Sequence, residues 1–178
     1  MDKNIREQIR KEALNFYAAA HITLTDAEKE RLEVADFGLN DIRTIGLEII
    51  TYVNTKKCCA KEMVLLPGQI CPEHRHAPMA DIKYDGKEET FRCRYGEVFL
   101  YVEGDPTPSP KFAPPEKYKA YLAVRHEVRL LPGQQYTIYP NTKHWFASNT
   151  GAVISEFSTT SYDEYDIFTD PNIVRVEK

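Results

Sequence analysis

Apolar residues in the first part of the chain recur at helical spacing. Ile5, Ile9 and Phe16 follow roughly the period of an α-helix, and Ala13 and Ala20 fill the positions between them. The residues around them are charged or polar. This pattern predicts an amphipathic helix at the start of the chain.

A second helix is expected to begin at Thr25. Thr25 is a candidate N-cap, and Glu28 three residues later completes a capping box. Leu32 continues the apolar pattern, and Gly38 is a residue type that commonly ends a helix. The sequence therefore predicts a helical N-terminal segment over 1–44.

From about residue 45 the apolar positions alternate with a period of two. Turn residues such as Pro67-Gly68, Gly96, Pro132-Gly133 and Gly151 separate the segments. The expected strand regions are LEIITYVNT, CCAKEMVLLPG, ETFRCRYGEVFLYVEG, HEVRLLPGQQYTIYP and HWFASNTGAVISEFS. Short strands without intervening helices predict a mainly β fold, a sandwich or a barrel, over 45–160. A proline-rich loop (105–117) interrupts the strands, and a polar and aromatic tail (161–178) is expected to cover the barrel rim.

Composition narrows the class of protein. A chain of 178 residues with 42% hydrophobic and 11% aromatic residues is expected to form a single domain, 1–178, with its own core. A net charge of −4 without a basic stripe argues against nucleic-acid binding. The charged N-terminus lacks the apolar region of a signal peptide, and no apolar run is long enough for a membrane span, so we expect a cytoplasmic location. The four cysteines form no C-x-x-C pair and are expected to be free thiols.

Two of the five histidines stand two residues apart in GQICPEHRH. In a strand, His74 and His76 point to the same face, where two imidazoles can hold a metal ion. The alternative is a solvated strand end, because Glu73 and Arg75 beside them are polar. The spacing alone leaves both interpretations open.

The surrounding spacings resemble the two motifs of the cupins. Five residues separate Gly68 from His74, and six separate Glu89 from Gly96, as in the first cupin motif. The gap between His76 and Glu89 is longer than usual, with twelve residues. The second motif matches less well: six residues separate Gly133 from Pro140, Thr142 stands where glycine is usual, and Asn149 lies one residue late. The resemblance implies a cupin-type β-barrel (jelly roll) with a divalent metal held by His74, His76, Glu89 and His144, with Glu88 as the alternative to Glu89.

A narrower resemblance covers nearly the whole chain. The segments CPEHRH, ETFRCRYGEVFLYVEG, YTIYPNTKHWF and FSTTSYDEYDIFTDP are similar to those of the D-lyxose isomerases, whose short members have the same long gap after the second histidine. The resemblance implies a metal-dependent aldose–ketose isomerase that interconverts D-lyxose and D-xylulose, and also D-mannose and D-fructose, by proton transfer through an enediol. It further implies a homodimer, which the exposed strand edges of a small barrel also favour.

The resemblance also indicates catalytic residues. It places Glu156 in the pocket as the base, although its strand alone fits an exterior glutamate as well. Lys61 is expected to bind substrate and balance the charge of the enediolate; a strand-edge lysine facing water is the alternative. In the tail, Asp163 and Asp166 are candidates for binding sugar hydroxyls, and Asp166 is preferred because Ile167 and Phe168 would fix its position.

The ligand set does not choose one metal. Three imidazoles and a carboxylate suit an octahedral divalent ion with open positions for substrate, and we expect Mn²⁺, with Zn²⁺, Co²⁺, Ni²⁺ and Fe²⁺ as alternatives. The motifs lack an arginine-rich or glycine-rich anion cradle, so a free sugar is expected and not a sugar phosphate. Two other functions use the same ligands: an Fe²⁺-dependent dioxygenase and a sugar-binding cupin without catalysis.

Overall fold

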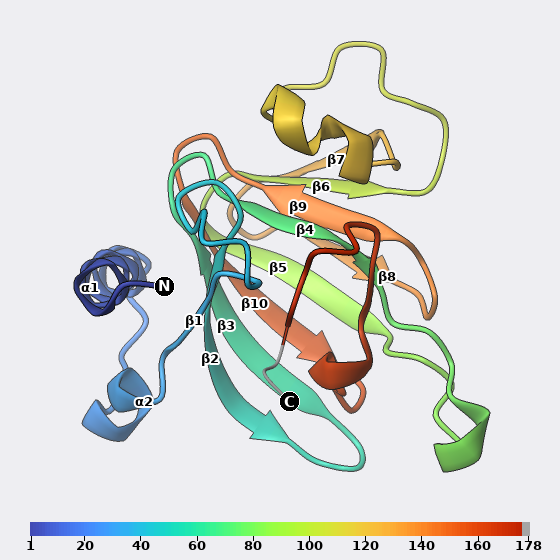
Figure 1. Ribbon diagram of the computed structural model, residues 1–178. Coiled ribbons are helices and arrows are strands. Elements are labelled where there is room, and N and C mark those ends of the chain that lie inside the picture. Colours follow the sequence, from blue (N-terminus) through green and yellow to red (C-terminus); the bar gives the residue numbers. More distant parts are fainter. Residues whose placement is uncertain (176–178) are drawn as a thin grey trace.

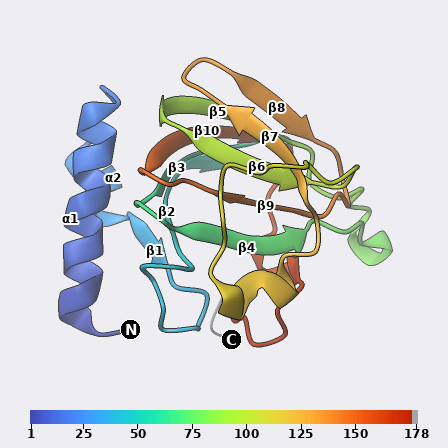
Figure 2. The same ribbon diagram turned by 90° about the horizontal axis from the view of Figure 1, so that it is seen from above.

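Two antiparallel β-sheets face each other and form the body of the protein (Figure 1). The computed structural model describes residues 1–175. The larger sheet has the strand order β1-β2-β3-β10-β5-β8, and the smaller one has the order β11-β4-β9-β6-β7. Seen from above, the two sheets curve around a common interior, and α1 stands outside it (Figure 2).

The strands occupy the regions that the period-two pattern predicts. The larger sheet consists of β1 (Glu33–Ala35), β2 (Leu47–Asn54), β3 (Cys59–Leu65), β10 (Ala152–Ser158), β5 (Glu89–Gly96) and β8 (Gln135–Ile138). The smaller sheet consists of β11 (Ile167–Phe168), β4 (Ile70–Arg75), β9 (His144–Ala147), β6 (Val98–Val102) and β7 (His126–Leu130). Three strands, β1, β4 and β11, lie outside the strand regions that the pattern predicts.

The interior between the sheets is the main hydrophobic core. Its largest buried side chains include Phe91 and Leu65 from the larger sheet and Phe99, Leu100 and Phe146 from the smaller one. At one end of this interior, polar side chains join Phe91 and Phe146 in lining a pocket.

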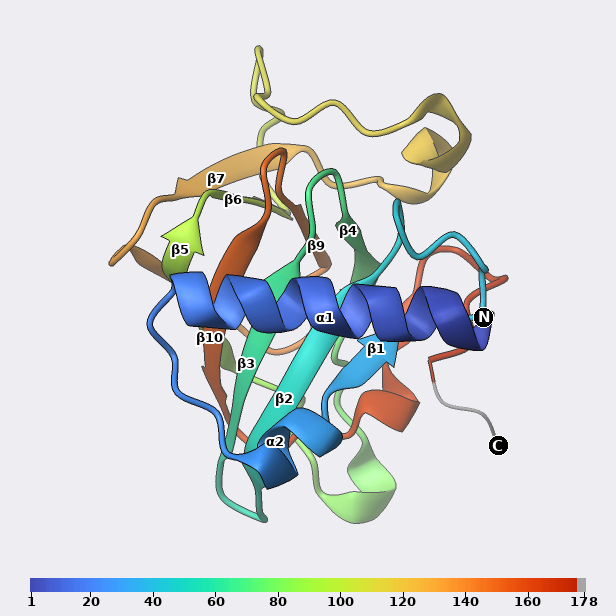
Figure 3. The ribbon, with the colours of Figure 1, turned by 90° about the vertical axis from the view of Figure 1, so that its left-hand side faces the viewer.

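Helix α1 (Lys3–Ala19) lies across the outer face of the larger sheet (Figure 3). Its buried stripe is Ile9, Ala13 and Tyr17, at helical spacing, while Ile5 is exposed. These side chains form a second core with outward-facing residues of the sheet, among them Val153. The helix thus leaves the opposite, pocket-facing side of the sheet free.

The second helix is shorter than predicted. The capping box of Thr25 and Glu28 is present, but α2 ends after five residues (Asp26–Glu30). The prediction that it continues to Gly38 is wrong, because residues 33–35 pair with β2 as strand β1 and bury Val34 beneath α1. Gly38 lies in the following turn with a positive φ of 73°.

Three 3₁₀ helices lie in the connections: η1 (Ala80–Ile82), η2 (Glu116–Tyr121) and η3 (Asp163–Tyr165). The proline-rich loop before η2 stands away from the body at the top of Figure 1. The fold class is confirmed: the protein is mainly β, of cupin type, with a helical N-terminal segment. No helix in the described part of the chain is long and apolar enough to cross a membrane.

Candidate active site

Three histidines of the smaller sheet converge at the polar end of the interior. His74 in β4 and His144 at the start of β9 are direct partners in the antiparallel register, and His76 follows two residues after His74 on the same face. Their ring centroids lie 4.3 to 5.4 Å apart. One ring nitrogen from each lies within 4.8 Å of the others, and all three side chains are buried.

Hydrogen bonds fix the orientation of each ring. The Nδ1 atom of His74 lies 2.8 Å from the carbonyl of Pro72, and that of His144 lies 2.9 Å from the carbonyl of Thr142. The Nδ1 atom of His76 lies 2.5 Å from Oδ1 of Asp166. Because carbonyl and carboxylate oxygens only accept, each Nδ1 carries a proton, and Nε2 is the nitrogen of each ring that can bind a metal.

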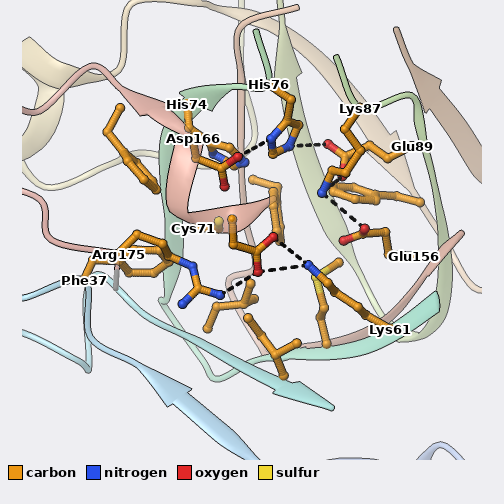
Figure 4. A pocket seen from close by; sticks show the side chains of 17 residues that line it. Phe37, Lys61, Cys71, His74, His76, Lys87, Glu89, Glu156, Asp166 and Arg175 are labelled. Carbon is orange, nitrogen blue, oxygen red and sulfur yellow. Dashed lines mark hydrogen bonds and ion pairs between the residues drawn. The ribbon is translucent and has the colours of Figure 1, made fainter. Parts of the chain in front are cut away.

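Glu89 faces these histidines from the larger sheet. Its Oε1 atom lies 3.2 Å from Nε2 of His76 (Figure 4). The same atom lies 3.0 Å from Nε2 of His144. The neighbouring Glu88 is exposed. The structure therefore places Glu89, and not Glu88, beside the three rings.

These four side chains fit a divalent metal ion. Nε2 of His144 is buried and has no hydrogen-bond partner among residues 1–175, although Glu89 is close. Two lone pairs at 3.0 Å repel each other unless a cation lies between them. Adjacent ligands of an octahedral ion are about 3 Å apart when each metal–ligand bond is about 2.1 Å. The distances from Glu89 to His76 and His144 match this spacing.

Glu156 lies beside this cluster on the larger sheet. It is 2% exposed, and β10 brings it opposite Lys61 of β3 on one side and Phe91 of β5 on the other. Its carboxylate accepts hydrogen bonds from Lys87, at 3.2 Å, and from Ser158, at 2.8 Å. The carboxylate therefore lies in a charged and polar environment.

Lys87 is a site residue that the sequence analysis missed. Its buried Nζ lies 2.7 Å from Oε2 of Glu89 and 3.2 Å from Oε1 of Glu156, so it joins the two carboxylates. The signal was present in the sequence, because Lys87 precedes Glu89 by two residues and shares its face. Gly86 before it has a positive φ of 95°, and a Cβ there would lie 2.7 Å from the carbonyl of His76. Glycine is therefore required for this approach.

The ammonium group of Lys61 forms ion pairs within the pocket. Its Nζ lies 3.0 Å from Asp163 and 3.1 Å from the hydroxyl of Ser161. Asp163 in turn pairs with Arg175 at 3.0 Å, and Arg175 also pairs with Glu33 of β1. No spacing in the sequence indicates that Arg175 belongs to the pocket, because this residue lies far from the motifs along the chain.

Burial and neighbouring charges shift the pKa values in opposite directions. Burial lowers the pKa of Lys87, but Glu156 and Glu89 raise it more, so it stands well above its usual range. The pKa of Lys61 is also raised, because Glu156 and Asp163 outweigh burial. Burial, reinforced by the other two histidines, holds the pKa of His74 well below its usual range. The two lysines are therefore cations, and His74 is neutral, as a metal ligand must be.

The pocket contains most of the residues that the sequence analysis singled out. Lys61, His74, His76, Glu89, Glu156 and Asp166 all line it, and His144 lies against Glu89. Its apolar wall is formed by Phe37, Leu47, Ile49, Met63, Cys71, Phe91, Phe146 and Phe168. Burial holds the pKa of the Cys71 thiol well above its usual range. This cysteine is therefore a neutral part of the wall.

Comparison with known proteins gives close relatives over the full length. No protein-family model matches the chain. A D-lyxose ketol-isomerase of Thermofilum sp. is 55% identical over 177 residues, which cover 99% of this chain and 97% of that protein. A D-lyxose/D-mannose isomerase of Thermosediminibacter oceani is 52% identical over the same shares. A D-lyxose ketol-isomerase of Cohnella laeviribosi is 52% identical over 95% of this chain and 92% of that protein.

Solved structures share the fold at low sequence identity. The L-ribose isomerase of Cellulomonas parahominis superposes with a TM-score of 0.80 at 17% identity, covering 97% of this chain and 94% of that one. The L-ribose isomerase of Acinetobacter sp. DL28, in complex with L-ribose, gives a TM-score of 0.80 at 16% identity over the same shares. At these identities the similarity establishes the fold.

Proposed function

The chain belongs to the D-lyxose ketol-isomerase family, and from this we propose that it interconverts D-lyxose and D-xylulose. D-mannose and D-fructose form a second substrate pair in the proposal, as the name of one relative indicates. D-mannose has the same configuration as D-lyxose at carbons 2 to 4, and the two differ only at the end remote from the reacting carbons. One site can therefore accept both sugars.

The proposal rests on one main observation: a possible metal-binding cluster and a separate carboxylate lie in the same pocket. His74, His76, Glu89 and His144 would hold a divalent ion, and Glu156 lies beside them without belonging to the set. Bound there, the ion would act as a Lewis acid toward the first two oxygens of the sugar. An isomerase also needs a base beside the reacting carbons, and Glu156 supplies a carboxylate for that role.

In the proposed reaction Glu156 removes the proton from C2 of the aldose and returns it to C1 of the enediol, while the hydroxyl proton of O2 passes to O1. Its bonds to Lys87 and Ser158 fix the carboxylate in one orientation. Lys61, a cation held by Asp163, would donate a hydrogen bond to a sugar oxygen on which negative charge develops. Asp166 was predicted to bind substrate, but its carboxylate is turned toward His76, and its contact with the sugar stays a prediction.

Charge balance in the pocket supports an anionic intermediate. Four carboxylates and three cations line its described part: Glu89, Glu156, Asp163 and Asp166, and Lys61, Lys87 and Arg175. Their sum is one negative charge, and a divalent ion would leave one positive charge. When Glu156 takes the C2 proton, one negative charge moves from its carboxylate to the enediolate, and the total charge is unchanged. The remaining positive excess of one charge around the sugar would stabilise this anion.

The experiment that tests this function is a metal-replacement assay. The purified protein is treated with a chelator, divided, and supplied with Mn²⁺, Co²⁺, Ni²⁺, Zn²⁺ or Fe²⁺ before D-lyxose is added. We expect D-xylulose to form only after metal is restored, with Mn²⁺ among the active ions. In D₂O, proton transfer through an enediol should place deuterium at the transferred carbon.

The possible failures separate the alternatives. Oxygen uptake with Fe²⁺ and no D-xylulose would indicate a dioxygenase, and sugar binding without turnover would indicate a binding protein. Conversion that proceeds in full without any divalent ion would contradict the metal site. We also propose that the protein forms a homodimer. Size-exclusion chromatography with light scattering, which gives the molar mass in solution, would test this.

A further inference from the structure

The C-terminal segment reaches the candidate metal site as an added strand. Strand β11 pairs antiparallel with β4, and its register sets Ile167 opposite Arg75 and Phe168 opposite His74. Thr169 extends this contact, because its amide donates to the carbonyl of Glu73 at 3.0 Å and its hydroxyl donates to the Glu73 carboxylate at 2.6 Å. The segment thus runs along the same strand that carries His74.

His76 depends on this segment for its orientation. The rings of His74 and His144 are held by carbonyls only two residues earlier in the chain. The ring of His76 is held instead by Asp166, which is 90 positions further along the chain. The Asp166 side chain is 10% exposed, so little water competes for this bond. The orientation of the His76 ring therefore depends on a tertiary contact with the tail.

The bond to Asp166 also selects which nitrogen of His76 carries the proton. With the proton on Nδ1, Nε2 keeps its lone pair for a metal. With the proton on Nε2, the ring would donate to Oε1 of Glu89, which lies 3.2 Å away, and both atoms would be lost as ligands. A carboxylate at Nδ1 prevents this and strengthens the ligand, as do second partners of histidines in other metal sites.

We propose that Asp166 is a positioning residue that holds His76 as a metal ligand, so that docking of residues 163–170 and binding of the metal stabilise each other. The inference rests on the metal site of the proposed function. It assigns to Asp166 a part other than the substrate contact that the sequence predicts. Because coupling between two binding events is reciprocal, the factor by which the docked tail raises metal affinity is the factor by which metal favours the docked tail.

Calorimetric titration of the chelator-treated full chain with Mn²⁺ tests the first half. Loss of a second partner of a metal-binding histidine costs about 10- to 100-fold in affinity, and we expect this loss for Asp166→Ala. Asp166→Asn keeps an oxygen that accepts from Nδ1 and should recover part of it, even if the alanine variant folds poorly. Glu164→Ala, an exposed neighbour on η3, is the matched control and should bind as the wild type does.

Hydrogen exchange of residues 163–170, with and without Mn²⁺, tests the second half. Metal should slow exchange there in the wild type and in Glu164→Ala, and the slowing should shrink in Asp166→Ala by the factor seen in the affinity. The inference would be wrong if Asp166→Ala and the wild type bound Mn²⁺ with equal affinity, or if Mn²⁺ did not change the exchange rate of the tail. Neither result would contradict the metal site itself. A wild type that binds no divalent ion would overturn both, and the titration shows this separately.

Discussion

Glu48 is buried beneath α1, on the side of the larger sheet away from the pocket. It is 0% exposed, its Oε1 accepts from Nε2 of Gln69 at 3.0 Å, and its Oε2 has no hydrogen-bond partner in the described part of the chain. Burial raises the pKa of this carboxyl from 4.5 to about 8, although Gln69 and Arg43 lower it. We therefore expect Glu48→Gln to stabilise the protein in neutral and alkaline solution.

The magnitude follows from linkage between proton binding and folding. The native state keeps a proton that the unfolded chain releases, so the free energy of unfolding falls as pH rises from 4.5 to about 8 and is level above that. At about 1.4 kcal/mol for each pKa unit, the loss over this window is about 5 kcal/mol. Glutamine cannot ionise, and the variant avoids this loss.

Urea unfolding of the metal-free wild type and of Glu48→Gln at several pH values measures the effect. The difference in free energy of unfolding should grow from pH 5 to about pH 8 and then stay constant. Asp26→Asn is the control, because Lys29 holds the pKa of the exposed Asp26 carboxyl below its ordinary value. Its difference from wild type should not change between pH 6 and 9. If the difference in free energy of unfolding between Glu48→Gln and wild type did not change from pH 5 to 9, the argument that burial shields this carboxyl from water would be refuted.

Three substitutions in the pocket separate its parts. His74→Ala should lose both Mn²⁺ binding and isomerisation, and full turnover by the metal-free variant would exclude the metal site. Glu156→Gln should keep its Mn²⁺ affinity and lose about 10²- to 10⁴-fold in kcat, as expected for removal of a general base; a kcat near that of wild type would remove Glu156 from this role. Lys87→Met leaves the carboxylates of Glu89 and Glu156 buried without their shared cation, and should lower the free energy of unfolding of the metal-free protein by about 3–5 kcal/mol in urea. A loss below about 1 kcal/mol would show that the pair needs no cation.

The strands could be predicted because their pattern is local. Alternating apolar residues separated by glycine and proline turns gave most of the sheet strands, and Thr25 with Glu28 gave the start of α2. The end of α2 could not be predicted in this way. Val34 fits a helical stripe and a strand equally well, and pairing with β2, a tertiary contact, decides for the strand.

The residues of the site also divide into those that a local sequence pattern indicates and those that depend on tertiary contacts. The spacing of His74 and His76 on one strand is readable, and so was the position of Lys87 relative to Glu89, although it was overlooked. The contact of Asp166 with His76 depends on the register between β11 and β4, which no local pattern sets. Arg175 reaches the pocket only because the chain returns past β1, where it pairs with Glu33.

The order of strands in the larger sheet explains how the proposed metal site gains the proposed base. The smaller sheet supplies the three histidines, and Glu89 at the start of β5 faces them from across the interior as the fourth proposed ligand. Because β10 lies between β3 and β5, Glu156 is brought next to Lys61 on one side and close to the segment of Lys87 and Glu89 on the other. The proposed base therefore lies on a different strand from every proposed metal ligand. Changes on β10 should alter catalysis while metal affinity is kept, whereas changes on β4 or β9 should alter both.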